Sequence, residues 1–311
     1  MTQVETEKDN QSGYFKIATG VWGLKTLFVN VYFVAINKNE WVLVDTGLKG
    51  YSQYIKDTAQ ELFGNNPPKA IILTHGHFDH TGNILELLKA WDVPVFAHPL
   101  EIPYLNGVSS YPPPDPTVGG GLMSLMSVVY PRKSIDLNGS LKVLQNDNNI
   151  PVLPGWQYIH TPGHAPGHIA LFREKDRLLL AGDAFVTTKQ ESAFSIAMQS
   201  EIVSGPPKYF TYDWGAAKQS VKKLYNLNPA IAATGHGRPM VGEELAEGLK
   251  SLVENFDRVA IPSSGRYVKR PAKTNKRGVL YTPPKLVNKT LIASVIAVAG
   301  ILTFTIVRNL K

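Results

Sequence analysis

One short segment of the sequence concentrates side chains that bind metal ions or move protons. Between Thr74 and Asn83 it reads Thr-His-Gly-His-Phe-Asp-His-Thr-Gly-Asn, and it contains His75, His77, Asp79 and His80. Imidazole and carboxylate groups this close together would lack partners in a protein core, whereas a cation compensates them. Histidines at alternate positions, followed by an Asp-His pair, can face the two sites of a dinuclear centre about 3.5–4 Å across. The segment therefore predicts metal binding.

Three further candidate ligands follow short apolar segments later in the chain. His164, Asp183 and His236 each come directly after a glycine. Glycine permits the sharp turn and the close backbone approach that a compact site needs. Together with the first four residues they supply enough ligands for two metal ions.

The absence of cysteine restricts the chemistry further. Without thiols the chain forms no disulfide and has no thiolate nucleophile, so any metal is held by nitrogen and oxygen. We expect two divalent ions, with zinc as the default because it suits imidazole and carboxylate and needs no redox partner; iron and manganese remain alternatives.

Strands and helices alternate around these residues. Residues 15–45 have the pattern of a β-meander, and short apolar strands are expected at 70–73, 94–97, 156–159, 169–172, 178–181 and 231–233. Helical spacing is found at 51–63, 84–91, 216–224 and 243–257. A run of strands followed by this alternation predicts a layered α/β body.

The seven candidate ligands, in this order, resemble the metallo-β-lactamase superfamily over about residues 15–257. The resemblance implies a four-layer αββα sandwich with two metal ions at one edge of the facing sheets. One metal would be held by His75, His77 and His164, the other by Asp79, His80 and His236, and Asp183 would bridge them. Asp45, in a Val-Asp-Thr-Gly segment, resembles the first motif of the family and would support the histidine segment without binding metal.

The other histidines lie outside these ligand positions. His168 either orients a ligand by a hydrogen bond or is structural. His98 and His160 are expected to be structural.

A water bridging two such cations loses its proton near neutral pH and becomes a hydroxide that attacks a carbonyl or phosphoryl centre. The expected reaction is hydrolysis of an ester, thioester, lactone or phosphodiester. Asp79 is the expected catalytic side chain, because it could orient the hydroxide and pass its proton to the leaving group.

Branches of the superfamily differ in residues that this sequence has or lacks. The histidine motifs look most like glyoxalase II, although the C-terminal helical region that reads glutathione there has no clear counterpart. Zinc β-lactamases place a cysteine near Asp183, and lactonases commonly place a tyrosine where this chain has Phe185 and Val186. Three aromatic residues further on could line the pocket or pack in the core: Tyr209, Tyr212 and Trp214.

Two rival interpretations belong to other functional classes. A mononuclear iron oxidoreductase of the persulfide dioxygenase type shares the histidines but uses fewer of them. A non-catalytic membrane-tethered module would carry a decayed site. The presence of all seven ligand positions favours the dinuclear hydrolase over both.

Ile102 to Pro154 is rich in proline, glycine and serine, which favours a lid over the site, with a mobile surface loop as the alternative. It contains an apolar cluster, which permits the hypothesis of an amphiphilic substrate: Leu122, Met123, Leu125 and Met126.

The net charge of +7 arises largely after Asp257, the last acidic residue, so nucleic acid is not an expected partner of the folded body. We predict a catalytic domain over 1–262, a basic flexible linker over 263–289 and a transmembrane helix over 290–307. The linker would also attract anionic membrane lipid. Lysine and arginine are dense before the span, and the N-terminus lacks a secretory signal, which predicts a single-pass anchor in the cell membrane with the catalytic domain in the cytoplasm.

Overall fold

The larger of two central sheets contains seven strands in sequence order. The structure is a computed structural model that describes residues 13–198 and 200–285. The first four strands pair antiparallel as the predicted meander, and the last four pair in parallel. They are β1 (Tyr14–Ala18), β2 (Val21–Thr26), β3 (Val29–Ala35), β4 (Trp41–Val44), β5 (Ile71–Ile72), β6 (Val95–Ala97) and β7 (Leu141–Val143).

The second sheet has five strands in the order β12-β11-β10-β9-β8. Only β10 and β11 pair in parallel; the other neighbours are antiparallel. The strands are β8 (Trp156–His160), β9 (Ile169–Arg173), β10 (Leu178–Leu180), β11 (Ile231–Ala233) and β12 (Met240–Val241).

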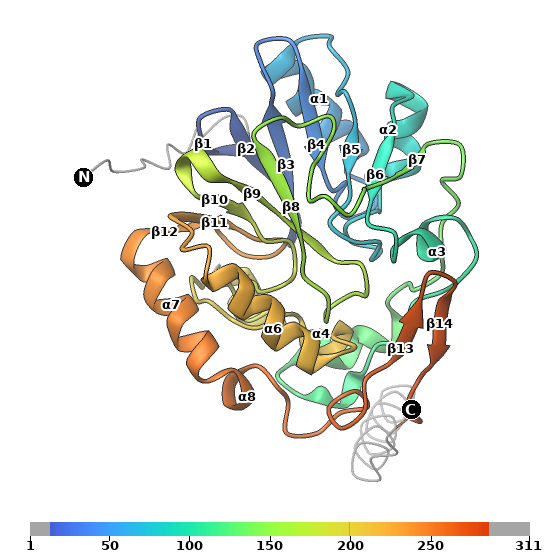
Figure 1. Cartoon of the computed structure of the whole chain (residues 1–311), viewed down its shortest axis with the longest axis vertical. Coiled ribbons are helices and arrows are strands. Elements are labelled where there is room, and N and C mark those ends of the chain that lie inside the picture. Colours follow the sequence, from blue (N-terminus) through green and yellow to red (C-terminus); the bar gives the residue numbers. More distant parts are fainter. Residues whose placement is uncertain (1–12, 199, 286–311) are drawn as a thin grey trace, which may run out of the picture.

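Helices cover the outer face of each sheet. Figure 1 shows α1 and α2 beside the first sheet, at the top, and α6 and α7 beside the second sheet, at the lower left. This arrangement is the predicted αββα sandwich. The bounds of these helices are α1 (Ser52–Phe63), α2 (Ile84–Trp91), α6 (Trp214–Tyr225) and α7 (Gly242–Glu254).

Alternating side chains hold the four layers together. In β3, Tyr32 and Val34 face the second sheet, whereas Val31 and Phe33 pack against the outer helices. Leu179 of β10 does the same on the other side, because it packs toward α6 and α7 while its two strand neighbours face the first sheet. Successive residues of a strand point to opposite faces, so sheets covered on both sides need apolar residues at every position.

Short elements occupy the irregular segments. Residues 102–154 include a few helical turns and β7, and whether they act as a lid stays a prediction. The remaining short helices are α3 (Ile102–Leu105), η1 (Pro116–Val118), α4 (Leu122–Met126), η2 (Ser127–Val129), η3 (Glu174–Asp176), α5 (Ala193–Met198), η4 (Lys208–Phe210) and α8 (Phe256–Val259).

The prediction of an unpacked linker is wrong over residues 263–285, which pack against the body. Tyr267 is 2% exposed, and its hydroxyl donates a hydrogen bond of 2.6 Å to the Pro113 carbonyl. A hairpin follows, formed by β13 (Lys273–Asn275) and β14 (Gly278–Tyr281). The segment has few apolar residues, but the body supplies the complementary surface, and composition does not reveal such long-range partners.

Among the described residues, no helix is long and apolar enough to cross a bilayer. The span predicted over 290–307 lies outside the described residues.

The packing of the terminal segment can be tested with Tyr267→Ala. Removing a buried aromatic ring is expected to lower the free energy of unfolding by about 3–5 kcal/mol. Tyr281→Ala, at a position that is 37% exposed on β14, is the control and should change it by less than about 1 kcal/mol. Denaturant unfolding measures the free energy of unfolding of both variants. Equally small decreases in the two would mean that the terminal segment does not pack against the body.

Candidate metal centre

The segment after β5 makes a tight turn that buries its four candidate ligands. The amides of His80 and Thr81 both donate to the His77 carbonyl, at 3.0 and 3.1 Å. The most exposed of the four ligands, Asp79, retains only 6% of its surface. The turn therefore directs the side chains into the protein.

Three imidazole nitrogens converge at the first part of the site. His77 Nδ1 lies 2.9 Å from both His75 Nε2 and His164 Nε2. Burial, and then the neighbouring histidines, lower the pKa of His75 and His77 well below 6.5, and burial lowers the pKa of His164 to about 3. The three rings are therefore neutral near pH 7, which is the protonation state that binds metal.

Asp183 joins this group to a second one. Its Oδ2 lies 3.1 Å from His236 Nε2 and 3.4 Å from His164 Nε2. His236 Nε2 is in turn 3.7 Å from Asp79 Oδ2. Three overlapping groups keep their ligand atoms within 4.8 Å of one another: His75, His77 and His164; His75, His80 and Asp183; Asp79, His80 and His236. The structure thus brings all seven predicted residues together.

Two buried polar atoms in the middle of this cluster have no hydrogen-bond partner. They are His80 Nε2 and Asp183 Oδ1, which lie 3.6 Å apart. Although burial opposes ionisation, the charges of His236 and His80 hold the pKa of Asp183 well below its usual range. Unpaired buried polar atoms are costly, and a cation between them would satisfy both. The donor set therefore fits divalent metal ions.

Asp45 supports the histidine segment from the end of β4. Its carboxylate accepts hydrogen bonds of 2.7 Å from the amide and the hydroxyl of Thr74, and it contacts His80 Nδ1 at 2.8 Å. The backbone of Asp45 is left-handed, with φ of 60°. Fixing Nδ1 leaves Nε2 of His80 directed at the cluster, which is the supporting role that the resemblance implies for Asp45.

Two glycines make room for the ligands. A Cβ atom at Gly235 would lie 2.0 Å from Asp183 Oδ1, so a larger residue would displace the carboxylate. Gly163 has φ of 133°, and a Cβ there would meet the backbone of Ala217 in α6. Both positions require glycine.

The remaining histidines lie outside the ligand groups. His168 accepts a hydrogen bond of 2.8 Å from the Asp183 amide and contacts the Thr161 hydroxyl at 2.7 Å, so it orients the backbone of Asp183. His98 and His160 stack on each other with ring centroids 4.0 Å apart.

Glu101 is a buried residue that sequence reasoning missed. Its carboxylate accepts hydrogen bonds from the Gly76 amide at 2.9 Å, from the Gly167 amide at 2.7 Å and from the Tyr111 hydroxyl. Burial raises its pKa to about 6. Gly76 lies between two ligands and Gly167 lies in the loop of His164, so Glu101 ties the two ligand loops together. One isolated glutamate gives no sequence signal of this role.

Aromatic rings line the side of His77. The Phe210 ring stacks on it at 4.5 Å, and the Tyr111 ring lies 4.5 Å away. The Tyr212 hydroxyl is 3.3 Å from His77 Nε2. Of the three aromatic residues proposed from sequence, Tyr212 thus contacts a candidate ligand directly, whereas Phe210 was not anticipated.

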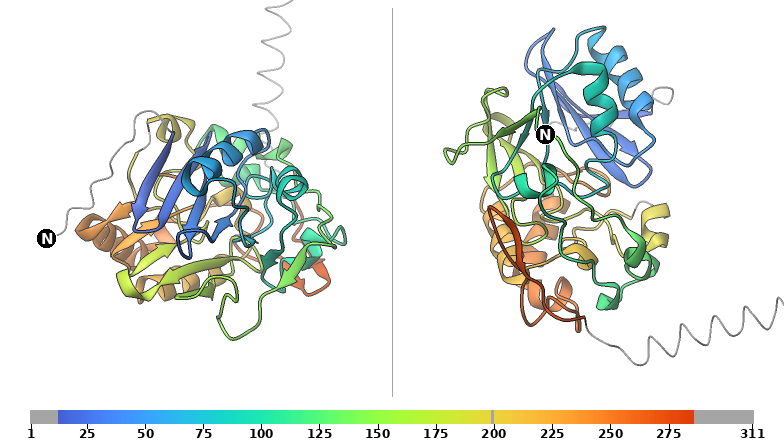
Figure 2. Two further views of the ribbon diagram at one scale, coloured as in Figure 1. Left: turned by 90° about the horizontal axis from the view of Figure 1, so that it is seen from above. Right: turned by 90° about the vertical axis from the view of Figure 1, so that its right-hand side faces the viewer.

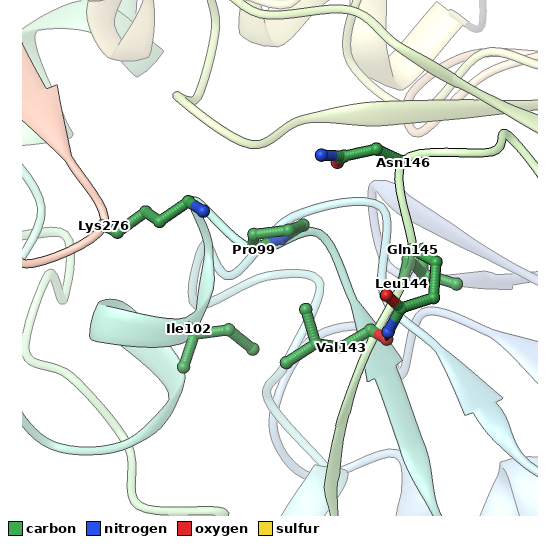
Figure 3. A pocket seen from close by; sticks show the side chains of 7 residues that line it. All are labelled: Pro99, Ile102, Val143, Leu144, Gln145, Asn146 and Lys276. Carbon is green, nitrogen blue, oxygen red and sulfur yellow. Dashed lines mark hydrogen bonds between the residues drawn. The ribbon is translucent and has the colours of Figure 1, made fainter.

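A separate pocket of about 370 Å³ opens between α3 and β7. Figure 3 shows Lys276, from the β13–β14 hairpin, reaching toward Pro99 at its edge. None of the seven candidate ligands lines it, and its lining provides amides and one amine, with no cluster of metal ligands: Pro99, Ile102, Val143, Leu144, Gln145, Asn146 and Lys276.

The fold and the cluster define the class of protein. The chain belongs to the metallo-beta-lactamase superfamily, whose sequence profile matches residues 24–236.

Particular relatives agree with this assignment. The Bacillus subtilis protein named Probable metallo-hydrolase YflN is 42% identical over 248 residues, which cover 79% of this chain and 94% of that protein. Probable metallo-hydrolase YybB from the same organism is 28% identical over 70% of this chain and 84% of its own length. The crystal structure of the B3 metallo-beta-lactamase BLEG-1 superposes with a TM-score of 0.53 at 23% identity, over 75% of this chain and 96% of that chain, and shows the shared fold.

Asp45→Asn tests the support of the cluster. Losing the charge beside His80 is expected to weaken metal affinity by about 10–100-fold. Competition with a chromophoric chelator measures the affinity, and Asp57→Asn on the exposed face of α1 is the control. Equal affinities in the two variants would contradict the supporting role.

Proposed function

We propose that the protein is a hydrolase that holds two divalent metal ions, zinc by preference, and cleaves an ester, thioester, lactone or phosphodiester bond. The observation that carries this proposal is the convergence of seven buried ligand side chains, among which Asp183 joins the histidine groups. The family membership and the relatives named as metallo-hydrolases support it.

The ligand groups suggest how the seven residues would be shared between two metal ions. His75, His77 and His164 would hold one ion, Asp79, His80 and His236 would hold the other, and Asp183 would contact both. When bound, such ions lower the pKa of a water and polarise the oxygen of the substrate.

Asp79 is the side chain best placed to move a proton. It is buried, and burial raises the pKa of its carboxyl. A carboxylate beside the attacking water can orient it, accept its proton and deliver that proton to the leaving group.

Tyr212 is placed to bind the substrate beside His77. Burial raises the pKa of its phenol well above 10, so the hydroxyl keeps its proton and can donate to a substrate oxygen. With Phe210 and Tyr111 it forms a wall that suits the apolar part of a small molecule. A nucleic-acid substrate is not proposed.

Thioesters are the first substrates to test, because the histidine motifs resemble those of glyoxalase II. The rival is a mononuclear iron oxidoreductase. A mononuclear enzyme would leave Asp79 and His236 without a metal. The Oδ2 atom of Asp79 and the Nε2 atom of His236 lie 3.7 Å apart in the same cluster, which favours a second ion.

The protein is also proposed to be tethered to the cytoplasmic face of the cell membrane. Residues 290–307 contain no charged side chain, and the preceding segment after Asp257 contains no acidic residue. An uncharged stretch of this length is about 27 Å as a helix, enough to cross the hydrocarbon core.

A hydrolysis screen over thioesters, lactones and phosphodiesters tests the catalytic proposal. We expect turnover that a chelator abolishes and added zinc restores. Asp183→Asn should lower kcat/KM by more than about 100-fold, since even partners of ligands change activity by 10–100-fold. Asp257→Asn, 67% exposed at its side chain, is the matched control and should leave activity unchanged.

Turnover that survives chelation would refute the metal-dependent mechanism. Oxygen consumption with one iron per chain, in place of hydrolysis, would favour the oxidoreductase.

A further inference from the structure

Exposed apolar side chains gather on two short helical segments. Among the described residues, seventeen large apolar side chains are exposed, and seven of them lie in residues 122–129 and 194–198. The most exposed are Phe194 at 73% and Val129 at 71%. We name these seven residues the α4–α5 surface: Leu122, Leu125, Met126, Val128, Val129, Phe194 and Met198.

The two segments form one surface because a backbone hydrogen bond joins them. The Met123 amide donates a hydrogen bond of 3.2 Å to the Glu191 carbonyl, which joins the start of α4 to the residues before α5. In the right-hand view of Figure 2, the green segment with α4 and the yellow helix α5 project at the same edge of the molecule. Apolar patches that remain exposed on a folded protein usually mark an interaction site.

The charges around this surface suit a negatively charged partner. Residues 116–134 contain no acidic side chain and end with Arg132 and Lys133. The start of the terminal segment, 263–270, also lacks acidic residues and carries Arg266, Lys269 and Arg270, whereas Lys276 of the β13–β14 hairpin lies at the α3–β7 pocket.

Hydrogen bonds join this basic segment to the residues that precede α4. The Arg266 amide donates to the Asp115 carboxylate, which also accepts from the Thr117 amide and so caps η1. Only a few residues separate η1 from α4. The terminal segment is therefore attached close to α4 at Arg266, and the uncharged residues 290–307 come later in the sequence, after Lys285.

The α4–α5 surface also borders the candidate metal centre. The Tyr130 hydroxyl donates to Met123 Sδ at 3.7 Å, and the Tyr130 ring lies 5.5 Å from the ring of Phe78. Phe78 stands between the ligands His77 and Asp79. A molecule held at this surface would thus be next to the histidine segment.

We infer that the α4–α5 surface inserts into the interfacial layer of an anionic lipid bilayer, so that the metal centre faces the membrane and takes amphiphilic substrates from it. The inference rests on the membrane tether proposed above. Apolar side chains flanked by basic residues bind such membranes by combining buried apolar area with attraction to anionic headgroups.

The absence of cysteine makes a site-specific test possible in the full chain. Leu125→Cys and Leu85→Cys each introduce a single thiol for a fluorophore that responds to solvent polarity. The two leucines are matched, because each is 49% exposed and each lies on a helix, α4 and α2 respectively. The labelled chains are reconstituted with vesicles of phosphatidylcholine and phosphatidylglycerol, with and without a spin-labelled lipid quencher.

The expected result is a blue shift and a loss of fluorescence with the quencher lipid at position 125, and neither at position 85. If the chain sediments with vesicles but both labels report water, the tether stands and the insertion of this surface is refuted.

A blue shift at position 125 without quenching also refutes the insertion, because the label is then covered by protein and not by lipid. If this blue shift grows with the protein-to-lipid ratio, a second copy covers the surface. If it stays constant, residues 286–311 cover it. A chain that does not sediment with vesicles refutes both the tether and the inference.

Discussion

The convergence of buried imidazole and carboxylate groups around Asp183 is the interaction on which the rest of the structure depends. His77 Nδ1 cannot form a full hydrogen bond with both nitrogens that lie 2.9 Å from it, since an imidazole nitrogen has either one lone pair or one hydrogen. The arrangement is stable only if rigid surroundings hold the rings in place and a cation compensates them. The two packed sheets, the tight histidine turn and the bonds of Asp45 and Glu101 supply that rigidity.

The sandwich brings together strand ends that are far apart in the sequence. β4 and β5 of the first sheet lead to Asp45 and to the histidine segment, while β8, β10 and β11 of the second sheet lead to the other three ligands. The apolar layer between the sheets, formed by alternate residues of each strand, keeps these ends in register. Glu101 then links two ligand loops directly. Ligand geometry is therefore a property of the whole fold and not of the motif alone.

Sequence reasoning succeeded where information is local. The alternating or helical periodicity predicted a layered α/β body. The resemblance carried by the histidine segment and by the three later ligands implied the four layers and the residues that meet. It failed where a role depends on distant partners. Glu101 and Phe210 carry no motif, because their function comes from loops that only the fold brings near. The packing of residues 263–285 was missed for the same reason, since the partner of Tyr267 is Pro113, which lies 154 residues earlier in the sequence.

The central claim is that the seven residues form a dinuclear metal site. The most direct measurement is the metal content of the purified full chain by elemental mass analysis, with protein concentration from amino-acid analysis. We expect two divalent ions per chain, because one carboxylate would serve both ions of the centre. A preparation that binds no metal, even after incubation with zinc, would contradict it.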